Sequence, residues 1–339
     1  MRLWIDQSAW RSRKALRKAA GIEMDQVRSI AVLKYGALGD MLLTRPFLIT
    51  LRQYFPQSRI VLGLISIYKK GIPYDLIDDI HVVDKGERSV SRIYRNYKEL
   101  GSHDIIFDIS ATTRSFWVTR LNKATLKIGF IYKGVHRLFY DVAVARSDYR
   151  FEAETFLDQL LVLGLSYEWP LEFGLPRKGI DKERPCILYF STASKLYKCW
   201  PAERFAELIR GLSQELPDYD HTLLAGIEDW EREICRNIGE AVGQRGNFRI
   251  AKGGDDALRW VMGAELVVSN DTGIRNMAIA AGRPTVGVFF STLPFRYLPR
   301  FGFHEAVFRA DRRPPTVEQV RTAVHKVLRA RMSKDAPPL

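Results

Sequence analysis

The sequence has few of the residues that build metal centres and disulfide frameworks. Its three cysteines lie far apart without a CxxC pair, and its six histidines show no HExxH motif and no paired spacing. Zinc sites and small disulfide-rich folds need such clusters. We therefore expect no metal site and no disulfides, which suits the reducing cytoplasm.

Long apolar runs are also missing. No stretch of about 18 apolar residues occurs, as a membrane-spanning helix requires, and residues 1–25 lack the apolar core of a secretory signal. Of the 339 residues, 46% are hydrophobic and 27% charged, which excludes a mostly disordered chain. At roughly 100–200 residues per domain, we expect a cytoplasmic protein of two domains.

Positive charge is what the chain has in excess. The formal net charge is +13 and the pI about 9.6, which favours anionic partners such as nucleotides, phosphorylated glycolipids or membrane surfaces. Nucleic acid is not expected, because the cations are spread along the chain and no nucleic-acid-binding motif occurs. Residues 1–25 are predicted to form a basic helix. It either packs on the body or rests on the anionic inner leaflet, where each basic residue contributes roughly 1 kcal/mol.

Strand-like and helix-like segments alternate from residue 29 onwards, which predicts parallel sheets with right-handed crossovers. The predicted strands are 29–34, 59–65, 80–83, 104–108, 126–130, 186–190, 221–225, 248–251, 265–269 and 285–289. The predicted helices are 41–54 with an interruption at Pro46, 89–100, 115–121, 152–163, 201–215, 230–242, 257–263, 275–281 and 316–331.

This rhythm predicts an α/β protein with two Rossmann-like, doubly wound parallel sheets. We expect a basic extension at 1–27, an amino-terminal domain at 28–170 and a linker at 171–184, where Pro, Gly and charged residues gather. A second domain follows at 185–315, and a helix and tail at 316–339. Two such domains predict a ligand cleft between them, at the carboxyl ends of the strands.

A glycine-containing turn at residues 34–40 links the first predicted strand to a helix. Its glycines, Gly39 among them, let the backbone approach a ligand closely. The GxGxxG fingerprint is incomplete, and residues 63–66 offer no carboxylate for a ribose, which argues against a nicotinamide-dependent oxidoreductase. Asp40 is either a helix cap, worth about 1 kcal/mol, or a general base at the mouth of the cleft.

The segment 191–201 follows a predicted strand and combines small hydroxyl residues with lysines. Ser194 and backbone amides could donate hydrogen bonds to a phosphate, and Lys198 could neutralise its charge. In the alternative interpretation, Pro201 simply starts a helix, Trp200 belongs to the core and the lysines are solvated.

The turn SNDTG, at residues 269–273, is the sharpest motif. A buried strand ends there and a helix of small residues begins. Free amides and the helix dipole suit a diphosphate, whereas the alternative is ordinary capping of the helix by Asp271 or Thr272.

Two further groups of charged residues follow predicted strands. Glu228 and Glu231 are candidates to hold ribose hydroxyls, although acidic residues at a helix start need no ligand. Asp108 and Arg114 face the predicted cleft and are candidates to contact an acceptor, although charged loop residues need no such role.

Together these motifs resemble glycosyltransferase family 9, the bacterial lipopolysaccharide heptosyltransferases of GT-B architecture, over about residues 28–330. The resemblance rests on the amino-terminal strand with GALGD and Pro46, on a second block at 104–130, on KCWP at 198–201 and on SNDTG at 269–273.

The resemblance implies transfer of a heptose or similar sugar from an ADP-sugar to a lipopolysaccharide-core or related glycan, with inversion and without a metal. The ADP-sugar is a substrate, so no cofactor is expected, and the acceptor is an anionic glycolipid or glycan. Asp40 matches the family's general base and Lys198 the lysine that neutralises the leaving diphosphate. The implied donor-binding residues are Ser194, Asp271, Thr272 and Gly273, with Glu228 or Glu231 at the ribose.

One segment departs from the family pattern. The family commonly carries proline or a small residue after the DTG, and histidine three residues past the glycine, where this chain has Ile274, Arg275 and Asn276. Asn276 can still donate a hydrogen bond, and Arg275 either supplies the positive charge or marks a different donor. The departure leaves open a non-catalytic relative that binds nucleotide or glycan.

Overall fold

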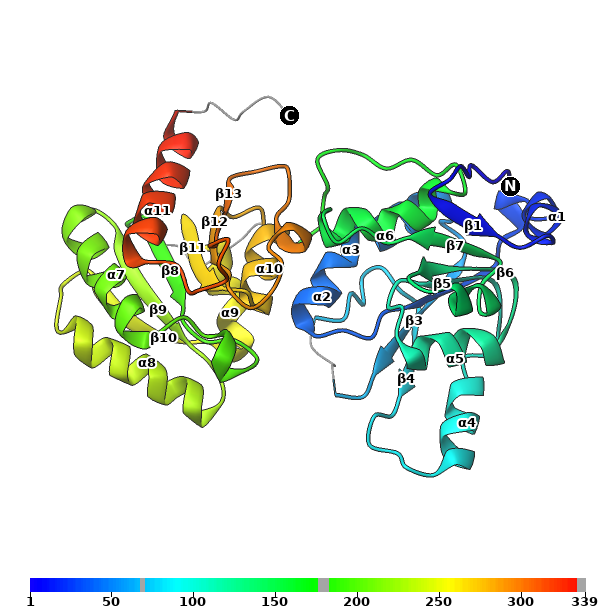
Figure 1. The fold of residues 1–339 in the computed structure, drawn as a ribbon, viewed down its shortest axis with the longest axis horizontal. Helices are drawn as coiled ribbons and strands as arrows, with labels where there is room; N and C mark the ends of the chain where they lie inside the picture. The colour runs from blue at the N-terminus through cyan, green and yellow to red at the C-terminus, as the bar shows by residue number, and fades with distance from the viewer. Residues whose placement is uncertain (68–70, 176–182, 334–339) are drawn as a thin grey trace. The chain divides into compact units, whose positions relative to one another are not determined.

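The computed structural model describes residues 1–67, 71–175 and 183–333. The chain divides into two compact units. Unit 1 comprises Met1–Asp148 and Glu152–Gly174, and unit 2 comprises Tyr149–Phe151 and Leu175–Leu339. The division between Gly174 and Leu175 falls within the segment that was expected to be a linker. Each unit is built on one largely parallel sheet with helices on both faces (Figure 1).

The sheet of unit 1 has the strand order β4-β3-β2-β5-β6-β7-β1. Its neighbouring strands are parallel, except that β1 runs antiparallel to β7. This is the order of a Rossmann fold with one strand added at an edge. The strands are β1 (Ala9–Arg11), β2 (Ser29–Leu33), β3 (Arg59–Ile65), β4 (Asp79–Val83), β5 (Ser102–Asp108), β6 (Lys123–Ile131) and β7 (Val142–Ala145).

Helices follow most of these strands. They are α1 (Ala15–Ala20), α2 (Leu38–Leu43), α3 (Arg45–Tyr54), α4 (Val90–Lys98), α5 (Thr113–Leu121) and α6 (Glu152–Leu161). The predicted interruption near Pro46 is confirmed, because α2 ends at Leu43 and α3 restarts with proline in its first turn. Arg45 then anchors the end of unit 1. Its buried guanidinium donates to Asp75 Oδ1 at 2.8 Å and to the carbonyls of Phe173 and Gly174.

The amino terminus differs from the single basic helix expected over residues 1–25. β1 instead extends the sheet, and α1 is a short helix that buries Ala15 and Ala19. Lys18 is held by Asp141 at 2.7 Å. The expected helix was wrong because the open edge of β7 offers backbone partners to a short strand, and this tertiary gain overrides local helix preference. The extension is therefore an integral part of unit 1.

Unit 2 repeats the Rossmann strand order as β10-β9-β8-β11-β12-β13, with every neighbouring pair parallel. The strands are β8 (Cys186–Phe190), β9 (Asp220–Ala225), β10 (Phe248–Lys252), β11 (Leu266–Asn270), β12 (Thr285–Val288) and β13 (His304–Val307). The helices are α7 (Ala202–Glu215), α8 (Asp229–Val242), α9 (Ala257–Met262), α10 (Gly273–Ala280) and α11 (Val317–Met332).

The helices of unit 2 cover opposite faces of its sheet. α7, α8 and α11 share one apolar core with the strands, whereas α9 and α10 contact each other on the other side (Figure 1). Short 3-10 turns occur at η3 (Leu196–Lys198) and η5 (Phe295–Tyr297).

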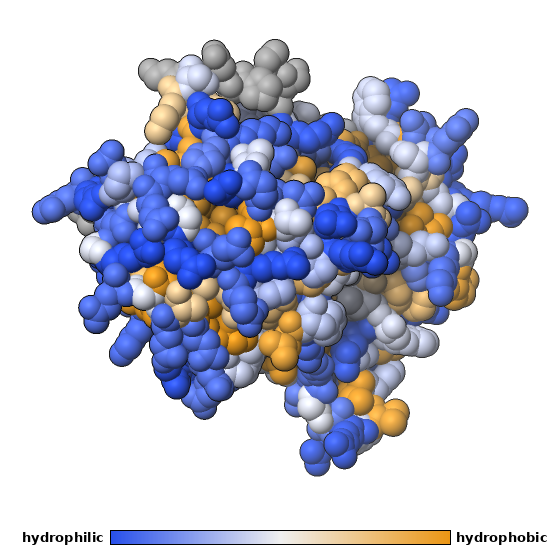
Figure 2. Space-filling view, turned by 60° about the vertical axis from the view of Figure 1, so that its left-hand side comes forward, coloured by the Kyte–Doolittle hydropathy of each residue, from blue (hydrophilic) through white to orange (hydrophobic). Residues whose placement is uncertain are grey.

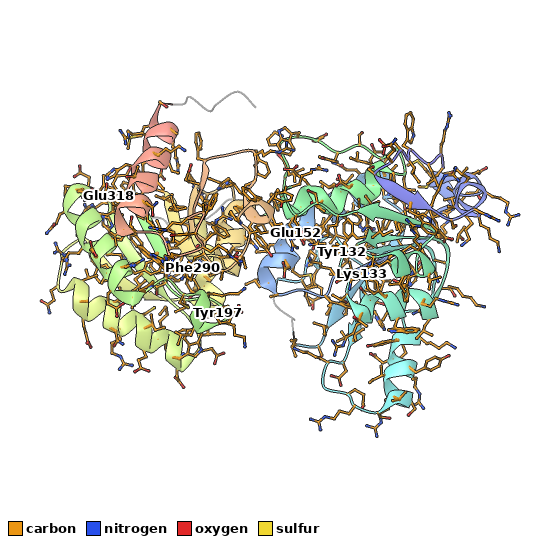
Figure 3. The ribbon with its side chains drawn as sticks, in the orientation of Figure 1. Tyr132, Lys133, Glu152, Tyr197, Phe290 and Glu318 are labelled. Carbon is orange, nitrogen blue, oxygen red and sulfur yellow. The ribbon has the colours of Figure 1, made fainter. Side chains whose placement is uncertain are left out.

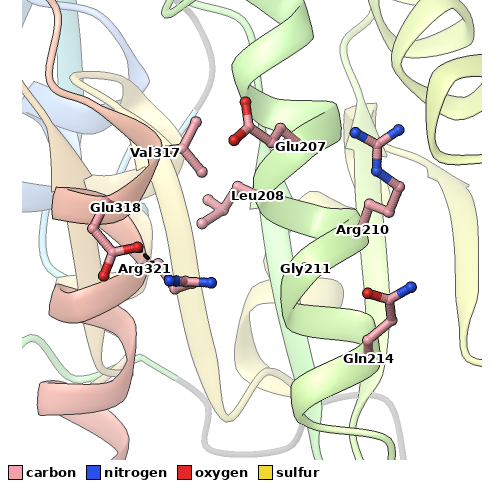
Figure 4. Close-up of a pocket in the computed structure, with 8 residues that line it drawn as sticks. All are labelled: Glu207, Leu208, Arg210, Gly211, Gln214, Val317, Glu318 and Arg321. Atoms are coloured by element: carbon pink, nitrogen blue, oxygen red, sulfur yellow. Dashed lines mark hydrogen bonds and ion pairs between the residues drawn. The ribbon is translucent and has the colours of Figure 1, made fainter.

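Polar and charged side chains cover most of the surface in view, and apolar ones form small patches (Figure 2). Every helix in the described part of the chain is too short or too polar to cross a bilayer. A polar groove runs between α7 and α11, where Arg321 pairs with Glu318 (Figure 4). The groove is lined by Glu207, Leu208, Arg210, Gly211, Gln214, Val317, Glu318 and Arg321.

A glycine in β6 makes room for a buried tyrosine, which gives a test of the packing in unit 1. A Cβ at Gly129 would lie 2.8 Å from Cδ1 of Tyr140, whose hydroxyl donates to Asp108 at 2.7 Å. We predict that Gly129→Ala lowers the free energy of unfolding by about 1–3 kcal/mol through overpacking. Chemical denaturation measures the change, with Gly134→Ala as control because no heavy atom lies within 4 Å of a Cβ there. Equal stability of the two variants would contradict the packing described.

Candidate functional site

The topology of unit 2 marks where a ligand fits. β8 and β11 are neighbours in the sheet, but β8 leads to α7 and β11 leads to α10, on opposite faces. In open parallel sheets, ligands bind at the carboxyl ends of the strands at such a switch point. Residues 191–201 and the turn at 271–273 flank it. Two of the three motifs from the sequence therefore meet at one place.

Asn270, the last residue of β11, joins these two segments. Its buried side-chain oxygen accepts from the backbone nitrogen of Trp200 at 2.9 Å, and its nitrogen donates to the carbonyl of Ser191 at 2.8 Å. Trp200 is itself buried and donates from its indole to the carbonyl of Pro315 at 2.8 Å. The loop is thus fixed at both ends.

The fixed loop presents its middle to solvent. Ser194 is exposed and Lys198 is partly exposed. Tyr197, beside Lys198 in η3, is 71% exposed and projects from unit 2 (Figure 3). A hydroxyl and an ammonium on an immobilised loop are suited to an anionic ligand.

Glu231 links this loop to the one that follows β9. One of its carboxylate oxygens accepts from Thr192 Oγ1 at 2.9 Å, and the other accepts from the backbone nitrogens of Ile227 and Glu228 at 3.0 Å each. A Cβ at Gly226 would lie 2.6 Å from Oε1 of Glu231 and would crowd the other atoms of the carboxylate. Glu231 therefore holds the loops after β8 and β9 together. Of the two ribose candidates, Glu228 is the better placed because it is exposed.

The turn after β11 opens α10. Thr272 is the N-cap, and its side chain accepts from the backbone nitrogen of Ile274 at 3.2 Å. Asp271 accepts from Thr292 Oγ1 at 2.6 Å, which ties in the loop after β12. Thr272 therefore caps α10, as in the alternative interpretation, and the turn is also partly exposed to solvent. Gly273 is the first residue of the helix.

Arg275 and Asn276 differ from the turn that precedes them, because both are buried. The Arg275 guanidinium donates to the carbonyl of Tyr297 and lies 5.2 Å from the ring centre of Phe289. Burial lowers the pKa of Arg275 to about 10, so the group remains a cation at neutral pH. Direct contact of either side chain with a donor stays a prediction that requires these side chains to become exposed.

Unit 1 has its own switch point, between β2 and β5. The loops that follow these strands are joined, because the backbone nitrogen of Tyr35 donates to Ser110 Oγ and that of Ile109 donates to the Leu33 carbonyl at 3.2 Å. Asp40 lies in the first turn of α2 and accepts from the Ala37 nitrogen at 3.3 Å. It thus caps α2 and remains partly exposed.

Asp108 and Arg114 occupy the second of these loops and differ in exposure. Asp108 is fully buried and accepts from the Ser110 and Ala111 nitrogens and from the Tyr140 hydroxyl. Burial raises the pKa of Asp108, and these bonds oppose the rise. Its acceptor contact stays a prediction that requires these bonds to open, whereas Arg114, in the first turn of α5, is exposed.

The linking residues Asn270, Thr192 and Thr292 were not among the predicted functional side chains, since each acts on a segment distant in sequence. In the described residues, no three His, Cys, Asp or Glu side chains are grouped so that they could hold a metal ion. That a metal is dispensable stays an expectation.

Residues 93–326 match the model of glycosyltransferase family 9 (heptosyltransferase), which is more than half of the chain. The chain belongs to glycosyltransferase family 9. The predicted family is thereby confirmed. No curated protein sequence matches the chain.

Solved structures of family 9 share the fold. The family 9 glycosyl transferase of Veillonella parvula DSM 2008 has a TM-score of 0.70 at 21% identity, covering 91% of this chain and 98% of that one. The E. coli heptosyltransferase WaaC with ADP has 0.69 at 20% identity, covering 90% and 98%. E. coli ADP-heptose lps heptosyltransferase II has 0.64 at 19% identity, covering 91% and 100%. The predicted GT-B class of fold, with two Rossmann-like sheets, is confirmed.

A prediction follows from the role of Asn270. Asn270→Ala leaves the buried Trp200 nitrogen and Ser191 carbonyl without their partner, and we expect the free energy of unfolding to fall by about 2 kcal/mol. Denaturant unfolding followed by tryptophan fluorescence measures this fall. Ser194→Ala, an exposed change on the same loop, serves as control. A variant at position 270 that is as stable as this control would show that the link contributes nothing.

Proposed function

We propose that this family 9 member transfers a heptose or similar sugar from an ADP-sugar to a lipopolysaccharide-core or related anionic glycan, with inversion at the anomeric carbon. The observation that carries the proposal is the link at the switch point of unit 2, where Asn270 joins the loop that carries Lys198 to the strand that leads into the turn before α10. The structural neighbours support the donor class, since WaaC was solved with ADP and with ADP-2-deoxy-2-fluoro heptose.

The donor side stabilises the departing ADP. As the bond between the anomeric carbon and the diphosphate breaks, negative charge grows on the phosphate oxygens. The Lys198 ammonium and the amino end of α10 at Thr272 and Gly273 supply positive charge to these oxygens, and Ser194 donates a hydrogen bond. Exposed Glu228 holds the ribose hydroxyls. These groups would let the transfer proceed without a metal.

The acceptor side supplies the base. An acceptor hydroxyl attacks the anomeric carbon from the face opposite the diphosphate, which gives inversion. Its oxygen forms the new glycosidic bond, its proton passes to the Asp40 carboxylate, and ADP leaves with the electrons of the broken bond. The family match begins at residue 93, so this role for Asp40 rests on the GALGD motif and on its place at the switch point of unit 1.

The exposed surface of α4 is the part of unit 1 that we propose rests on the anionic inner leaflet, at the cytoplasmic face. Val90 is 81% exposed and Tyr94 50% exposed, one turn apart on a helix with no buried residue. Five exposed cations lie on α4 and in the segment before it, namely Lys85, Arg88, Arg92, Arg95 and Lys98; Lys98 Nζ lies 5.2 Å from the ring centre of Tyr94, and Arg92 pairs with Glu87 at 3.4 Å. Apolar side chains beside cations suit an anionic membrane surface, where each cation contributes roughly 1 kcal/mol.

Substitutions of Lys198 and Asp40 are both expected to slow transfer but to differ in their effect on ADP affinity. We predict that Lys198→Ala weakens ADP binding about 10- to 100-fold, the worth of a charge-assisted hydrogen bond, and slows transfer. Asp40→Asn is expected to leave ADP affinity unchanged and to slow transfer about 10²- to 10⁴-fold, because a general base is lost. Calorimetric titration with ADP and an assay of ADP release from ADP-heptose with a lipopolysaccharide-core acceptor give the two quantities.

The matched control is Lys195→Ala, which removes an exposed lysine from the same loop and is expected to change neither quantity. Equal losses at positions 195 and 198 would refute a specific role for Lys198, and full turnover of Asp40→Asn would refute the base. A wild-type protein that binds ADP but releases none from any ADP-sugar and acceptor would be the non-catalytic alternative.

The membrane contact has its own test. We predict that Val90→Glu combined with Tyr94→Glu reduces cosedimentation with vesicles of anionic phospholipid at least tenfold, while ADP affinity stays unchanged. Vesicles of neutral phosphatidylcholine are expected to bind neither protein, because the cations then find no partner. Undiminished binding of the double variant to anionic vesicles would place the contact elsewhere.

A further inference from the structure

Arg275 is a cation in the core of unit 2, behind the amino end of α10. Its relative exposure is 0%, and its Nη1 donates to the carbonyl of Tyr297 in η5. Within the described residues, Nε and Nη2 have no hydrogen-bond partner. A buried guanidinium with unsatisfied donors costs free energy, and an apolar side chain of similar size would avoid that cost. The arginine must therefore contribute something that an apolar residue cannot.

The surroundings of Arg275 are shaped to this side chain. The guanidinium carbon lies 5.2 Å from the ring centre of Phe289. A Cβ at Gly287, in β12, would lie only 2.8 Å from Cδ of Arg275. The strand can pass this close to Arg275 because Gly287 has no side chain. A lysine has neither the planar group that stacks on a ring nor the same donor position.

The partner of Arg275 belongs to a loop that reaches the donor-side turn. Residues 289–297 leave the carboxyl end of β12, and Phe290 lies at the start of this loop (Figure 3). Farther along, Thr292 donates to Asp271 at 2.6 Å, and Tyr297 accepts from Arg275. The loop is thus attached twice near the start of α10, once at the partly exposed turn and once in the core.

We propose that Arg275 is a positioning residue that holds the loop 289–297 so that Thr292 orients Asp271 at the nucleotide-binding turn. This inference rests on the proposed function, in which this turn binds the ADP part of the donor. Because Arg275 is fully buried, it acts in this proposal through the loop and not by direct contact with the donor. The two attachments depend on each other, since a loop freed at Tyr297 no longer presents Thr292 to Asp271.

The first experiment is a double-mutant cycle on ADP affinity, measured by calorimetric titration of the full chain. Arg275→Met and Thr292→Val are each expected to weaken ADP binding about three- to tenfold, the equivalent of one lost hydrogen bond. The double variant is expected to lose little more than one single variant, because both changes break the same arrangement. Arg275→Lys is expected to bind ADP no more tightly than Arg275→Met does. Gly287→Ala, which displaces the guanidinium, is expected to weaken ADP binding as Arg275→Met does.

The second experiment needs no ligand. Trypsin cleaves after Arg296, which lies in the held loop. We expect Arg275→Met to increase the rate of this cleavage at least fivefold, read from the peptide that ends at Arg296, because local opening exposes the bond.

Gly129→Ala separates positioning from general destabilisation, since it weakens unit 1 and is expected to leave ADP affinity and cleavage at Arg296 unchanged. ADP affinity of Arg275→Met equal to that of the wild type, or losses that multiply in the double variant, would overturn the proposal. A wild-type protein that binds no ADP would overturn the proposed function instead. The cleavage rate would then decide whether Arg275 holds the loop.

Discussion

The buried amide of Asn270 is the contact on which the arrangement of the loops at the switch point of unit 2 depends. β8 and β11 send their chains to opposite faces of the sheet, so the segments after them would diverge without a link. Asn270, the last residue of β11, provides that link by donating to Ser191 and accepting from Trp200, at the two ends of the segment after β8. An amide offers both a donor and an acceptor, whereas a carboxylate would face the Ser191 carbonyl without a proton. These two hydrogen bonds explain the asparagine in the motif SNDTG.

A glycine paired with a carboxylate recurs in both units. Gly36 packs against Asp40 and Gly226 packs against Glu231, and in each pair a Cβ would crowd the carboxylate. The two carboxylates differ in how firmly they are held. Glu231 accepts three hydrogen bonds of 2.9–3.0 Å, whereas Asp40 accepts one of 3.3 Å from Ala37. The same pairing of a glycine with a carboxylate therefore holds two loops together in unit 2, whereas in unit 1 it leaves Asp40 weakly held and partly exposed, as the proposed role of Asp40 requires.

The sequence predicts most of the fold because parallel strands buried on both faces are short apolar runs that helices separate. β3 and β8 occur at the predicted residues, and the break at Pro46 follows from the missing backbone donor of proline. β1, β7 and β13 escape prediction, since runs of three or four residues show little periodicity and are strands only through the neighbouring strand that receives them.

The sequence identifies the motifs of the candidate site but not the separate roles of the residues within them. Glu228 and Glu231 are equivalent in sequence, and what separates them is Thr192, 39 residues from Glu231. Similarly, the exposure of Arg275 depends on Gly287 and on the position of Tyr297, neither of which a local pattern contains. Pairings across loops decide such roles, and periodicity describes only single elements.

The departure from the family pattern at residues 274–276 lies behind the turn at residues 271–273 and not on its partly exposed surface. Ile274, Arg275 and Asn276 are all buried, whereas Asp271 and Thr272 remain partly exposed. The two cations, Lys198 and Arg275, differ in what they can contact. Lys198, partly exposed on a loop, can meet a phosphate directly, while a buried guanidinium is fixed by its stacking and its single carbonyl. The unusual residues therefore change what supports the turn while its exposed motif residues stay as in the family. A difference in donor would have to arise from the shape that this support gives to the loop after β12.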